Sequence, residues 1–392
     1  MIDTSIGVVK PRKFTFAHAP NELQLDSGQR LGPIDIMYET YGKLNSERSN
    51  AILVFHALSG DAHAAGYHSK KDEKPGWWDI AIGPNKAFDT TRYFVICANI
   101  IGGCKGSTGP SSVNSSTGKP YGLSFPLLTI KDMVKAQVAL LDHLGIGQLL
   151  AATGGSMGGF QVLQFAASFP DRCRLALPIA TAGRQSAQNI AFNEIGRRAI
   201  LADPRWNSGD YYDLHPPIDG LSIARMVGHV TYLSDSTLRS RFGRKIKKEA
   251  CGNGDTAFKD PYFEIESYLQ HKGAAFTRRF DANSYLYITK AIDLFDLAPG
   301  CDSLEPAFRK CRSRFLVLSF SSDWLYPPRQ SEELVDAIRA NGLAAEYHEI
   351  ESTYGHDAFL LEAEKMEGII SRFLITNATK HPYETDLEYP TS

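Results

Sequence analysis

The 392-residue sequence lacks the features that mark membrane, secreted and zinc-binding proteins. It has no run of about 18 apolar residues, which a membrane-spanning helix needs, and Met1 to Phe14 contains no apolar core of a secretory signal. Its six cysteines form no Cys-x-x-Cys pair and no zinc-type spacing with histidine. These absences indicate reduced thiols in a cytoplasmic protein, and we expect no metal ion.

A strong charge of one sign is also absent. The formal net charge is −2, with 42 Lys and Arg residues against 44 Asp and Glu residues, and no basic cluster indicates nucleic acid or an anionic membrane as partner. The glycine-rich stretch 102–107 does not have the Gly-x-x-x-x-Gly-Lys-Ser/Thr spacing of a phosphate loop, which argues against nucleotide hydrolysis. Hydrophobic residues make up 43% of the chain, enough for a sizeable buried core.

What the sequence does contain is a series of short, continuously apolar runs. Such runs are typical of parallel strands buried on both faces of a sheet. They lie at 52–55, 93–97, 149–152, 175–179 and 315–320, with helical patterns at 130–144, 332–340 and 357–374. Thr129 and Asp132 open the first helix with a capping-box pattern. Residues 34–41 alternate with period two, as antiparallel edge strands do. The sequence therefore predicts an α/β fold with a mostly parallel sheet.

The pattern changes between residues 181 and 298. Strand-like runs disappear there, and helical segments such as 186–202 and 281–294 dominate. We therefore expect residues 1–180 and 299–379 to form the core, and 181–298 to form a helical lid inserted above the carboxyl ends of the strands. The polar residues 380–392 are expected to be a frayed tail.

The stretch Gly154-Gly155-Ser156-Met157-Gly158 lies between an apolar run and a helical pattern. This is the context of a Gly-x-Ser-x-Gly nucleophile elbow, a sharp strand-to-helix turn that exposes the serine hydroxyl. The glycines are needed because a Cβ would collide with neighbouring backbone. Ser156 is therefore the predicted nucleophile of an acyl-transfer reaction.

A nucleophilic serine needs a base within hydrogen-bond reach and an acid that orients the base. In elbow enzymes the acid and then the base follow the serine along the chain. Asp323 fits the acid because it comes directly after the apolar run 315–320, whereas Asp296 and Asp302 follow no strand.

His356 fits the base because a strand-like run at 345–350 precedes its loop and a helical pattern follows it. His348 lies within the strand pattern, and His381 lies in the tail. The sequence also allows plainer roles for the chosen pair, a turn-forming aspartate and a loop or capping histidine.

The oxyanion of an acyl-transfer intermediate needs two N–H donors. One is the backbone N–H of Met157, directly after the serine. The other is expected in the loop after an earlier strand, where the run at 51–55 leads into residues 56–60 (HALSG), and we predict the N–H of Leu58. His56 is interpreted as a structural residue of this loop.

A triad of this kind predicts acyl transfer but not the acceptor, because esterases, thioesterases, peptidases and acyltransferases share it. A binding module on the same scaffold is a further alternative, although the intact order of the triad argues against it.

The sequence resembles the homoserine O-acyltransferases of methionine biosynthesis from about residue 14 to residue 373. The motifs that carry the resemblance lie at 56–60 (HALSG), 102–112 (GGCKGSTGPSS), 154–159 (GGSMGG), 186–194 (SAQNIAFNE), 224–229 (ARMVGH), 279–285 (RFDANSY) and 354–360 (YGHDAFL).

The resemblance implies an α/β-hydrolase core with a helical lid, acting as a cytoplasmic homodimer. It also implies Ser156, Asp323 and His356 as the triad. With this triad we expect a ping-pong reaction through an acyl-Ser156 intermediate. Family substrate contacts match Arg225 and Asp357. Homoserine carries a carboxylate and an ammonium, so a guanidinium and a carboxylate can hold both ends. No cofactor is expected, and the acyl donor, acetyl-CoA, is a co-substrate.

The acyl donor is predicted from Leu325. Members that resemble succinyltransferases have an arginine after the Asp-Trp pair, where Asp323-Trp324 is followed here by Leu325. A neutral side chain offers a second carboxylate no countercharge, which favours acetyl-CoA. Succinyl-CoA as donor, L-serine as acceptor in place of L-homoserine, and simple ester hydrolysis remain the alternatives.

Overall fold

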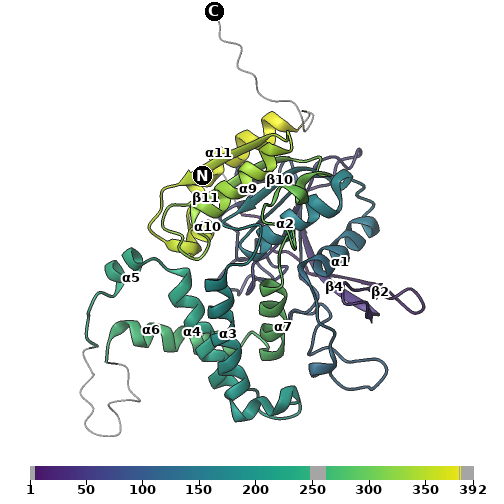
Figure 1. Ribbon diagram of the computed structural model, residues 1–392. Helices are drawn as coiled ribbons and strands as arrows, with labels where there is room; N and C mark the ends of the chain where they lie inside the picture. Colours follow the sequence, from purple (N-terminus) through teal and green to yellow (C-terminus); the bar gives the residue numbers. More distant parts are fainter. Residues whose placement is uncertain (1–4, 248–261, 379, 381–392) are drawn as a thin grey trace, which may run out of the picture.

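The computed structural model describes residues 5–247, 262–378 and 380. Its central sheet has eight strands, which Figure 1 shows with the surrounding helices. In spatial order the strands are β1 (Arg12–Phe16), β4 (Ile34–Tyr41), β8 (Phe94–Ala98), β5 (Ala51–Val54), β9 (Leu149–Gly155), β10 (Cys173–Ile179), β11 (Arg314–Phe320) and β12 (Ala345–Ile350). The predicted tail lies outside the described residues except for Lys380.

The strands pair as the sequence predicts. β1 and β4 are antiparallel, β4 and β8 are antiparallel, and from β8 onward all neighbours run parallel. The antiparallel strands therefore lie at one edge. Two short ladders stand apart from the sheet: β2 (Leu23–Gln24) with β3 (Arg30–Leu31), and β6 (Ile82–Gly83) with β7 (Phe88–Asp89).

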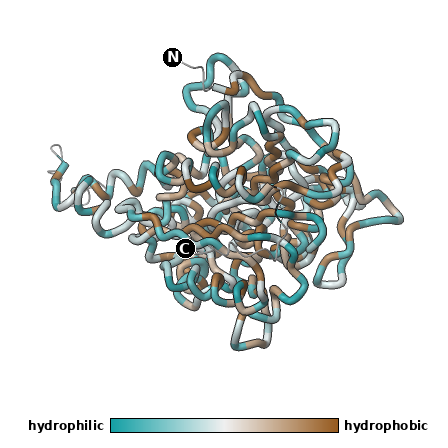
Figure 2. Tube along the Cα trace, turned by 90° about the horizontal axis from the view of Figure 1, so that it is seen from above, coloured by the Kyte–Doolittle hydropathy of each residue, from teal (hydrophilic) through white to brown (hydrophobic). Residues whose placement is uncertain are grey.

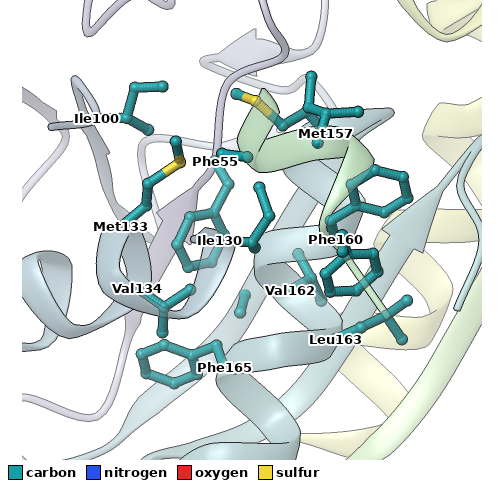
Figure 3. Packing of buried hydrophobic residues seen from close by; sticks show 14 of the residues in the cluster. Phe55, Ile100, Ile130, Met133, Val134, Met157, Phe160, Val162, Leu163 and Phe165 are labelled. Carbon is teal, nitrogen blue, oxygen red and sulfur yellow. The ribbon is translucent and has the colours of Figure 1, made fainter. Parts of the chain in front are cut away.

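Helices and loops cover both faces of the sheet, which explains the continuously apolar strands. One face packs against α1 (Ile130–His143), α2 (Met157–Ser168) and α9 (Pro328–Ala340). The other packs against α11 (Ala363–Asn377) and the segment 64–88. Figure 2 shows the hydrophobic segments concentrated inside the molecule, and Figure 3 shows side chains of α1 and α2 in the core.

The start of α1 confirms the predicted capping box. The Thr129 hydroxyl accepts a hydrogen bond from the Asp132 N–H at 3.2 Å, and the Asp132 carboxylate accepts one from the Thr129 N–H at 3.1 Å. Two of the N–H groups that a helix start leaves unpaired are satisfied in this way.

The last helix was predicted as one segment, 357–374, and this is wrong. It consists of α10 (Ala358–Leu361) and α11, separated at Glu362, whose ψ of 43° is not helical. The Phe359 carbonyl accepts a hydrogen bond from the Trp78 indole at 3.1 Å. The break lets α10 hold this contact while α11 packs on the sheet.

Between β10 and β11 the described residues form helices and isolated bridges only. The helices are α3 (Ala187–Ala202), α4 (Ile218–Tyr232), α5 (Asp235–Arg241), α6 (Glu264–Thr277), α7 (Ala282–Asp293) and α8 (Glu305–Phe308). Figure 1 shows α3, α4, α6 and α7 together on the side of the molecule opposite α9 and α11.

These helices are tied to the loops that follow β11 and β12. The Asn189 amide donates to the Leu325 carbonyl at 3.0 Å, and the Trp324 indole donates to the Leu233 carbonyl at 3.0 Å. The Thr237 hydroxyl donates to the Thr353 carbonyl at 2.6 Å. The segment therefore lies over the carboxyl ends of these strands.

Among the described helices, none has both the length and the apolar character that crossing a bilayer requires. The cysteines in the described residues are free thiols; they are Cys97, Cys104, Cys173, Cys301 and Cys311.

Candidate active site

Ser156 stands at the turn between β9 and α2, in a backbone conformation that side chains rarely adopt (φ 59°, ψ −125°). The flanking glycines make this turn possible. A Cβ on Gly154 would lie 2.5 Å from the Phe55 carbonyl oxygen, and one on Gly158 would lie 2.2 Å from the same atom. Both residues must therefore be glycine, and the end of β5 packs directly against the elbow.

Asp323 and His356 meet at the carboxyl ends of β11 and β12. One Asp323 oxygen lies 2.7 Å from the imidazole Nδ1, and the other accepts the N–H groups of Leu325 and Tyr326 at 3.0 and 2.9 Å. Both side chains are buried. Because the carboxylate holds the proton on Nδ1, Nε2 is left as the proton acceptor.

The histidine loop packs on the elbow. A Cβ on Gly155 would lie 2.4 Å from the Phe359 ring, so this glycine makes room for the helix that follows His356. The Tyr326 ring lies 5.1 Å from the imidazole and also lines the cavity at Ser156. No hydrogen bond joins the Ser156 hydroxyl to the imidazole among the described residues. Such bonds often form only in the complex with substrate.

The N–H groups of Leu58 and Met157 have no hydrogen-bond acceptor among the described residues. Leu58 lines the cavity together with Ser156. His56 braces this loop, because its Nδ1 lies 2.8 Å from the Ala57 carbonyl and its Nε2 accepts the Ile100 N–H at 3.2 Å. Burial lowers the pKa of His56, so the ring is neutral and holds the loop without a charge.

The cavity at Ser156 is small, about 50 Å³. Gln185, Asn189 and Leu325 contribute to its wall, and none of the described residues that line it is Lys or Arg. The Leu325 side chain is buried there.

Arg225 and Asp357 flank this region with opposite charges. The Arg225 guanidinium carbon lies 5.6 Å from the Tyr232 ring, and its Nη1 lies 3.4 Å from the Ser59 hydroxyl. Burial raises the pKa of Asp357, while His356 and Arg225 act to lower it. The two side chains are electrostatic neighbours, but they form no ion pair with each other.

Known proteins are similar to this chain in sequence and in fold. A family model for the alpha/beta hydrolase fold matches residues 50–363. A protein of Solidesulfovibrio magneticus named homoserine O-acetyltransferase is 54% identical over 373 residues, 95% of this chain and 94% of that protein. Another of that name, from Methanohalobium evestigatum, is 55% identical over 383 residues, 98% of this chain and 76% of that protein. The chain belongs to the homoserine O-acetyltransferase family of alpha/beta hydrolases.

Solved structures agree on the family and its fold. The crystal structure of homoserine O-acetyltransferase from Bacillus anthracis superposes with a TM-score of 0.87 at 30% identity, covering 96% of this chain and 100% of that chain. Esterase E22 superposes with a TM-score of 0.85, also at 30% identity, over 94% of this chain and 100% of that chain. Since an esterase has this fold too, the acceptor must be argued from the site.

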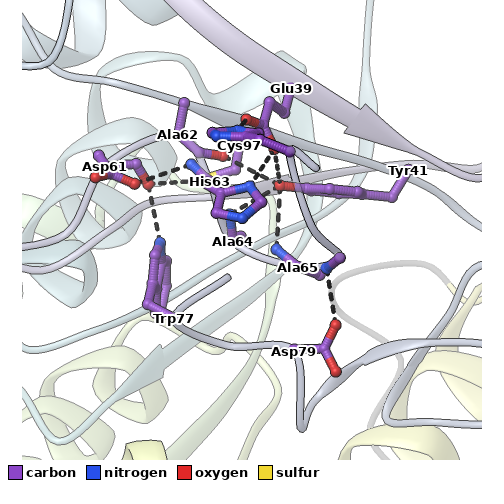
Figure 4. A network of polar contacts seen from close by, with 12 residues as sticks. Glu39, Tyr41, Asp61, Ala62, His63, Ala64, Ala65, Trp77, Asp79 and Cys97 are labelled. Atoms are coloured by element: carbon purple, nitrogen blue, oxygen red, sulfur yellow. Dashed lines mark hydrogen bonds and ion pairs between the residues drawn. The ribbon is translucent and has the colours of Figure 1, made fainter. Parts of the chain in front are cut away.

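The structure also contains a second cluster of titratable groups, shown in Figure 4. The buried Glu39 accepts the Tyr41 hydroxyl at 2.9 Å, and its two oxygens lie 3.0 Å from His63 Nδ1 and 2.6 Å from His68 Nε2. Among the described residues, Glu39, His63 and His68 are the one group of three or more His, Cys, Asp or Glu side chains whose potential metal-ligand atoms lie within 4.8 Å of one another. Both carboxylate oxygens are already hydrogen-bonded, so we interpret the cluster as an ion-pair network.

The charges in this network follow from its contacts. Burial acts to raise the pKa of Glu39, but the hydrogen bonds of His63 and His68 lower it below 4.5. Burial acts to lower the pKa of His63, but Glu39 raises it above 6.5. Glu39 therefore adds stability that is lost as pH falls, and His63 adds stability that is lost as pH rises. Both contributions are complete between pH 4.5 and 6.5. The network anchors the segment that directly follows the Leu58 loop.

Several residues of the site were missed by sequence reasoning. Tyr232 and Tyr326 line the cavity and lie beside the His356 ring, at 6.0 and 5.1 Å between ring centres. Gln185 and Asn189 supply polar groups, and Asn189 lies in a motif that was recognised without a role. Phe160 stacks on Phe295 at 4.3 Å and fixes the end of the helical segment. These contacts join residues that are far apart in the sequence, so the position of each residue in the chain does not predict them.

Proposed function

We propose that the protein transfers an acetyl group from acetyl-CoA to the γ-hydroxyl of L-homoserine, in methionine biosynthesis. The observation that carries the proposal is a buried Asp323–His356 pair beside a strained serine elbow, with Arg225 and Asp357 next to it, neither of them in an ion pair with another described residue. The triad supplies acyl transfer, and the two opposite charges match an amino-acid acceptor. The names of the relatives agree with this reaction.

The first half-reaction acylates the enzyme. His356 Nε2 takes the proton of the Ser156 hydroxyl while its oxygen attacks the thioester carbonyl. The oxyanion receives hydrogen bonds from the N–H groups of Leu58 and Met157. The C–S bond then breaks, and the thiolate takes the proton from His356, so that CoA leaves as the free thiol. Asp323 holds the imidazole tautomer throughout.

The second half-reaction runs the same steps with a new nucleophile. L-Homoserine enters, its γ-hydroxyl gives a proton to His356 Nε2, and its oxygen attacks the acetyl-serine carbonyl. The bond to Ser156 breaks, and the serine oxygen takes the proton back. The products are O-acetylhomoserine and a regenerated enzyme, and the proposed reaction needs no metal or cofactor.

Arg225 and Asp357 are proposed to orient the acceptor. The guanidinium pairs with the carboxylate of homoserine, and Asp357 pairs with its ammonium. Because Asp357 adjoins His356 in the chain, an acceptor held there presents its hydroxyl to the same imidazole. This positioning supplies part of the rate that a free alcohol would lack.

We expect Asp357→Asn to raise the KM for L-homoserine by roughly 10- to 100-fold, which corresponds to the loss of one charged hydrogen bond. In the native protein this KM should also rise as pH falls, beginning at a higher pH than for an ordinary aspartate because the pKa of Asp357 is raised. The variant should lack this rise. Initial rates across pH at several homoserine concentrations measure both effects. An unchanged KM would contradict the role of Asp357.

Acetyl-CoA is the proposed donor because no cation lines the cavity at Ser156 in the part of the chain described. We expect Leu325→Arg to raise the ratio of kcat/KM for succinyl-CoA to that for acetyl-CoA by about tenfold, since the new guanidinium would meet the succinyl carboxylate. Leu325→Met, which keeps size and neutrality, is the control. A ratio that stays the same in both variants would remove this explanation of donor choice.

Ester hydrolysis is the second candidate, favoured by the likeness to esterase E22. A matrix of donors and acceptors separates the two: acetyl-CoA, succinyl-CoA and p-nitrophenyl acetate against L-homoserine, L-serine and water. The proposed function requires that L-homoserine accelerate thiol release from acetyl-CoA well beyond the rate with water. Equal rates with and without L-homoserine would identify an esterase.

We further propose that the protein acts as a homodimer in the cytoplasm. Exposed apolar side chains on the helical segment support the dimer: Ile195 on α3, and Ile223 and Val230 on α4, are 52%, 48% and 41% exposed. An apolar surface of this kind is one that a second copy would cover.

A further inference from the structure

Four cationic side chains gather on the helical segment without a carboxylate partner. They are Arg225 on α4, Arg241 at the end of α5, Lys272 on α6 and Arg279 just after α6. Among the described residues, none of the four forms an ion pair within 4 Å. We call these four the basic face.

Two aromatic rings of α6 hold the basic face together. The Phe276 ring lies 4.8 Å from the Arg225 guanidinium carbon and 5.1 Å from that of Arg279. The Tyr268 ring lies 5.3 Å from the Arg241 guanidinium carbon and 5.6 Å from Lys272 Nζ. The cations therefore form an inner pair at Phe276 and an outer pair at Tyr268.

The gathered charges raise one another's electrostatic energy. Burial lowers the pKa of Lys272, and Arg225, Lys74 and Arg241 lower it further. Burial and the four cations also lower the pKa of His229 to about 3, so this ring adds no charge of its own. Two described carboxylates oppose this charge: Asp357 acts to raise the pKa of Lys272, and Asp61 acts to raise that of Arg279. The cations lie together despite their burial and their mutual repulsion. Such an excess of positive charge indicates a binding site for an anionic ligand.

The inner pair belongs to the site already described. Arg279 donates to the Ser59 carbonyl at 2.9 Å, and Arg225 lies 3.4 Å from the Ser59 hydroxyl. The outer pair does not line the cavity at Ser156, yet Lys272 is an electrostatic neighbour of Asp357. Since one guanidinium suffices for the carboxylate of an amino acid, the outer pair remains without a role in the acceptor reaction.

We infer that Arg241 and Lys272 bind the phosphate groups of the CoA moiety of the acyl donor. The inference rests on the proposed function. CoA carries its phosphates at the far end of the pantetheine arm, so they must lie outside the small acyl cavity but within reach of it. A guanidinium binds phosphate oxygens through its fork of donors, and an ammonium adds a point charge.

A second candidate site for the nucleotide part of CoA has to be distinguished from the outer pair. A cavity of about 420 Å³ is lined by Lys105, Arg278 and Arg279, among others. Its Asp281 accepts hydroxyl hydrogen bonds from Tyr211 and Tyr212, which places a carboxylate in the same wall. Among the residues that the structure describes, no carboxylate lies at hydrogen-bond distance from the outer pair, which favours the outer pair as the phosphate site.

The test compares two donors that differ in their phosphates. Acetyl-CoA and S-acetylpantetheine share the thioester and the arm, but the second has no phosphate. We expect Arg241→Gln and Lys272→Gln each to lower the ratio of kcat/KM for acetyl-CoA to that for S-acetylpantetheine by about tenfold, the loss of one charge-assisted contact. Lys105→Gln, with the same change of charge in the other cavity, should keep the ratio of the native protein. A partly misfolded variant lowers both rates and leaves the ratio unaffected.

Thiol release is measured with and without L-homoserine, so that two failures are distinguishable. If L-homoserine does not accelerate release, the proposed function fails, whereas the donor ratio still reports on phosphate binding. If the ratio is unchanged in both outer-pair variants, or falls only in Lys105→Gln, the inference is overturned.

Discussion

Ser156→Ala should lower kcat/KM for acetyl transfer by roughly 10⁴-fold or more, the loss seen when the nucleophile of a serine triad is removed. The structure explains why no other group would replace it. The elbow raises the Ser156 hydroxyl above the carboxyl end of β9, beside a cavity that Leu58 and Tyr326 line together. Release of CoA thiol in the presence of L-homoserine measures the effect.

The fold should survive this change. The Ser156 N–H donates to the Ile179 carbonyl at 3.0 Å, a bond that alanine keeps, and the serine hydroxyl has no partner among the described residues. Circular dichroism and the thermal midpoint check the fold. Intact mass after incubation with acetyl-CoA should show an acetyl adduct in the native protein and none in the variant. Near-normal turnover or an adduct in the variant would overturn the assignment of Ser156.

Asp323→Asn should lower kcat by roughly 10³- to 10⁴-fold, as expected when the histidine of a triad is held in the wrong tautomer. One Asp323 oxygen accepts two backbone N–H groups, so the amide oxygen of asparagine would stay there. Its NH₂ group would then face His356 Nδ1, 2.7 Å from the present oxygen. The imidazole would have to carry its proton on Nε2, where it cannot accept one from serine.

Asp302→Asn is the matched control, because Asp302 is exposed and follows no strand of the sheet. Its steady-state rates should equal those of the native protein. If Asp323→Asn also retained more than a tenth of the native kcat, another group would have to orient the imidazole.

The strands were predictable because both faces of the sheet are covered. A strand such as β9 or β11 is buried along its whole length, so it reads as a continuous apolar run. The break at Glu362 was not predicted; the hydrogen bond that α10 accepts beside it, at the Phe359 carbonyl, comes from the Trp78 indole, which lies far away in the sequence. The first fifty residues indicate β structure, but the bounds of β1 were not predicted, since its residues are largely exposed at the edge of the sheet and show no apolar run.

The triad residues could be chosen from chain order, because each follows a strand at the same end of a parallel sheet. The walls of the site could not. Tyr232 lies on α4, and how α4 packs on α6 decides which face of the helix points into the site; a single sequence carries no signal for that packing. Arg225 and Asp357 were proposed from family resemblance alone, because nothing in their sequence positions distinguishes them from other charged residues.

The two guanidinium contacts of Ser59 link the helical segment to the loop that contains Leu58. Outward movement of α4 and α6 would withdraw both contacts and free the Leu58 amide to turn away from the elbow. An opened enzyme would thus lose one of the two N–H groups that we propose stabilise the oxyanion, at the same time as solvent entered. Hydrolysis of the acetyl-serine would then be slow because the Leu58 N–H is displaced when water enters. The acetyl group would remain on Ser156 until an amino alcohol binds.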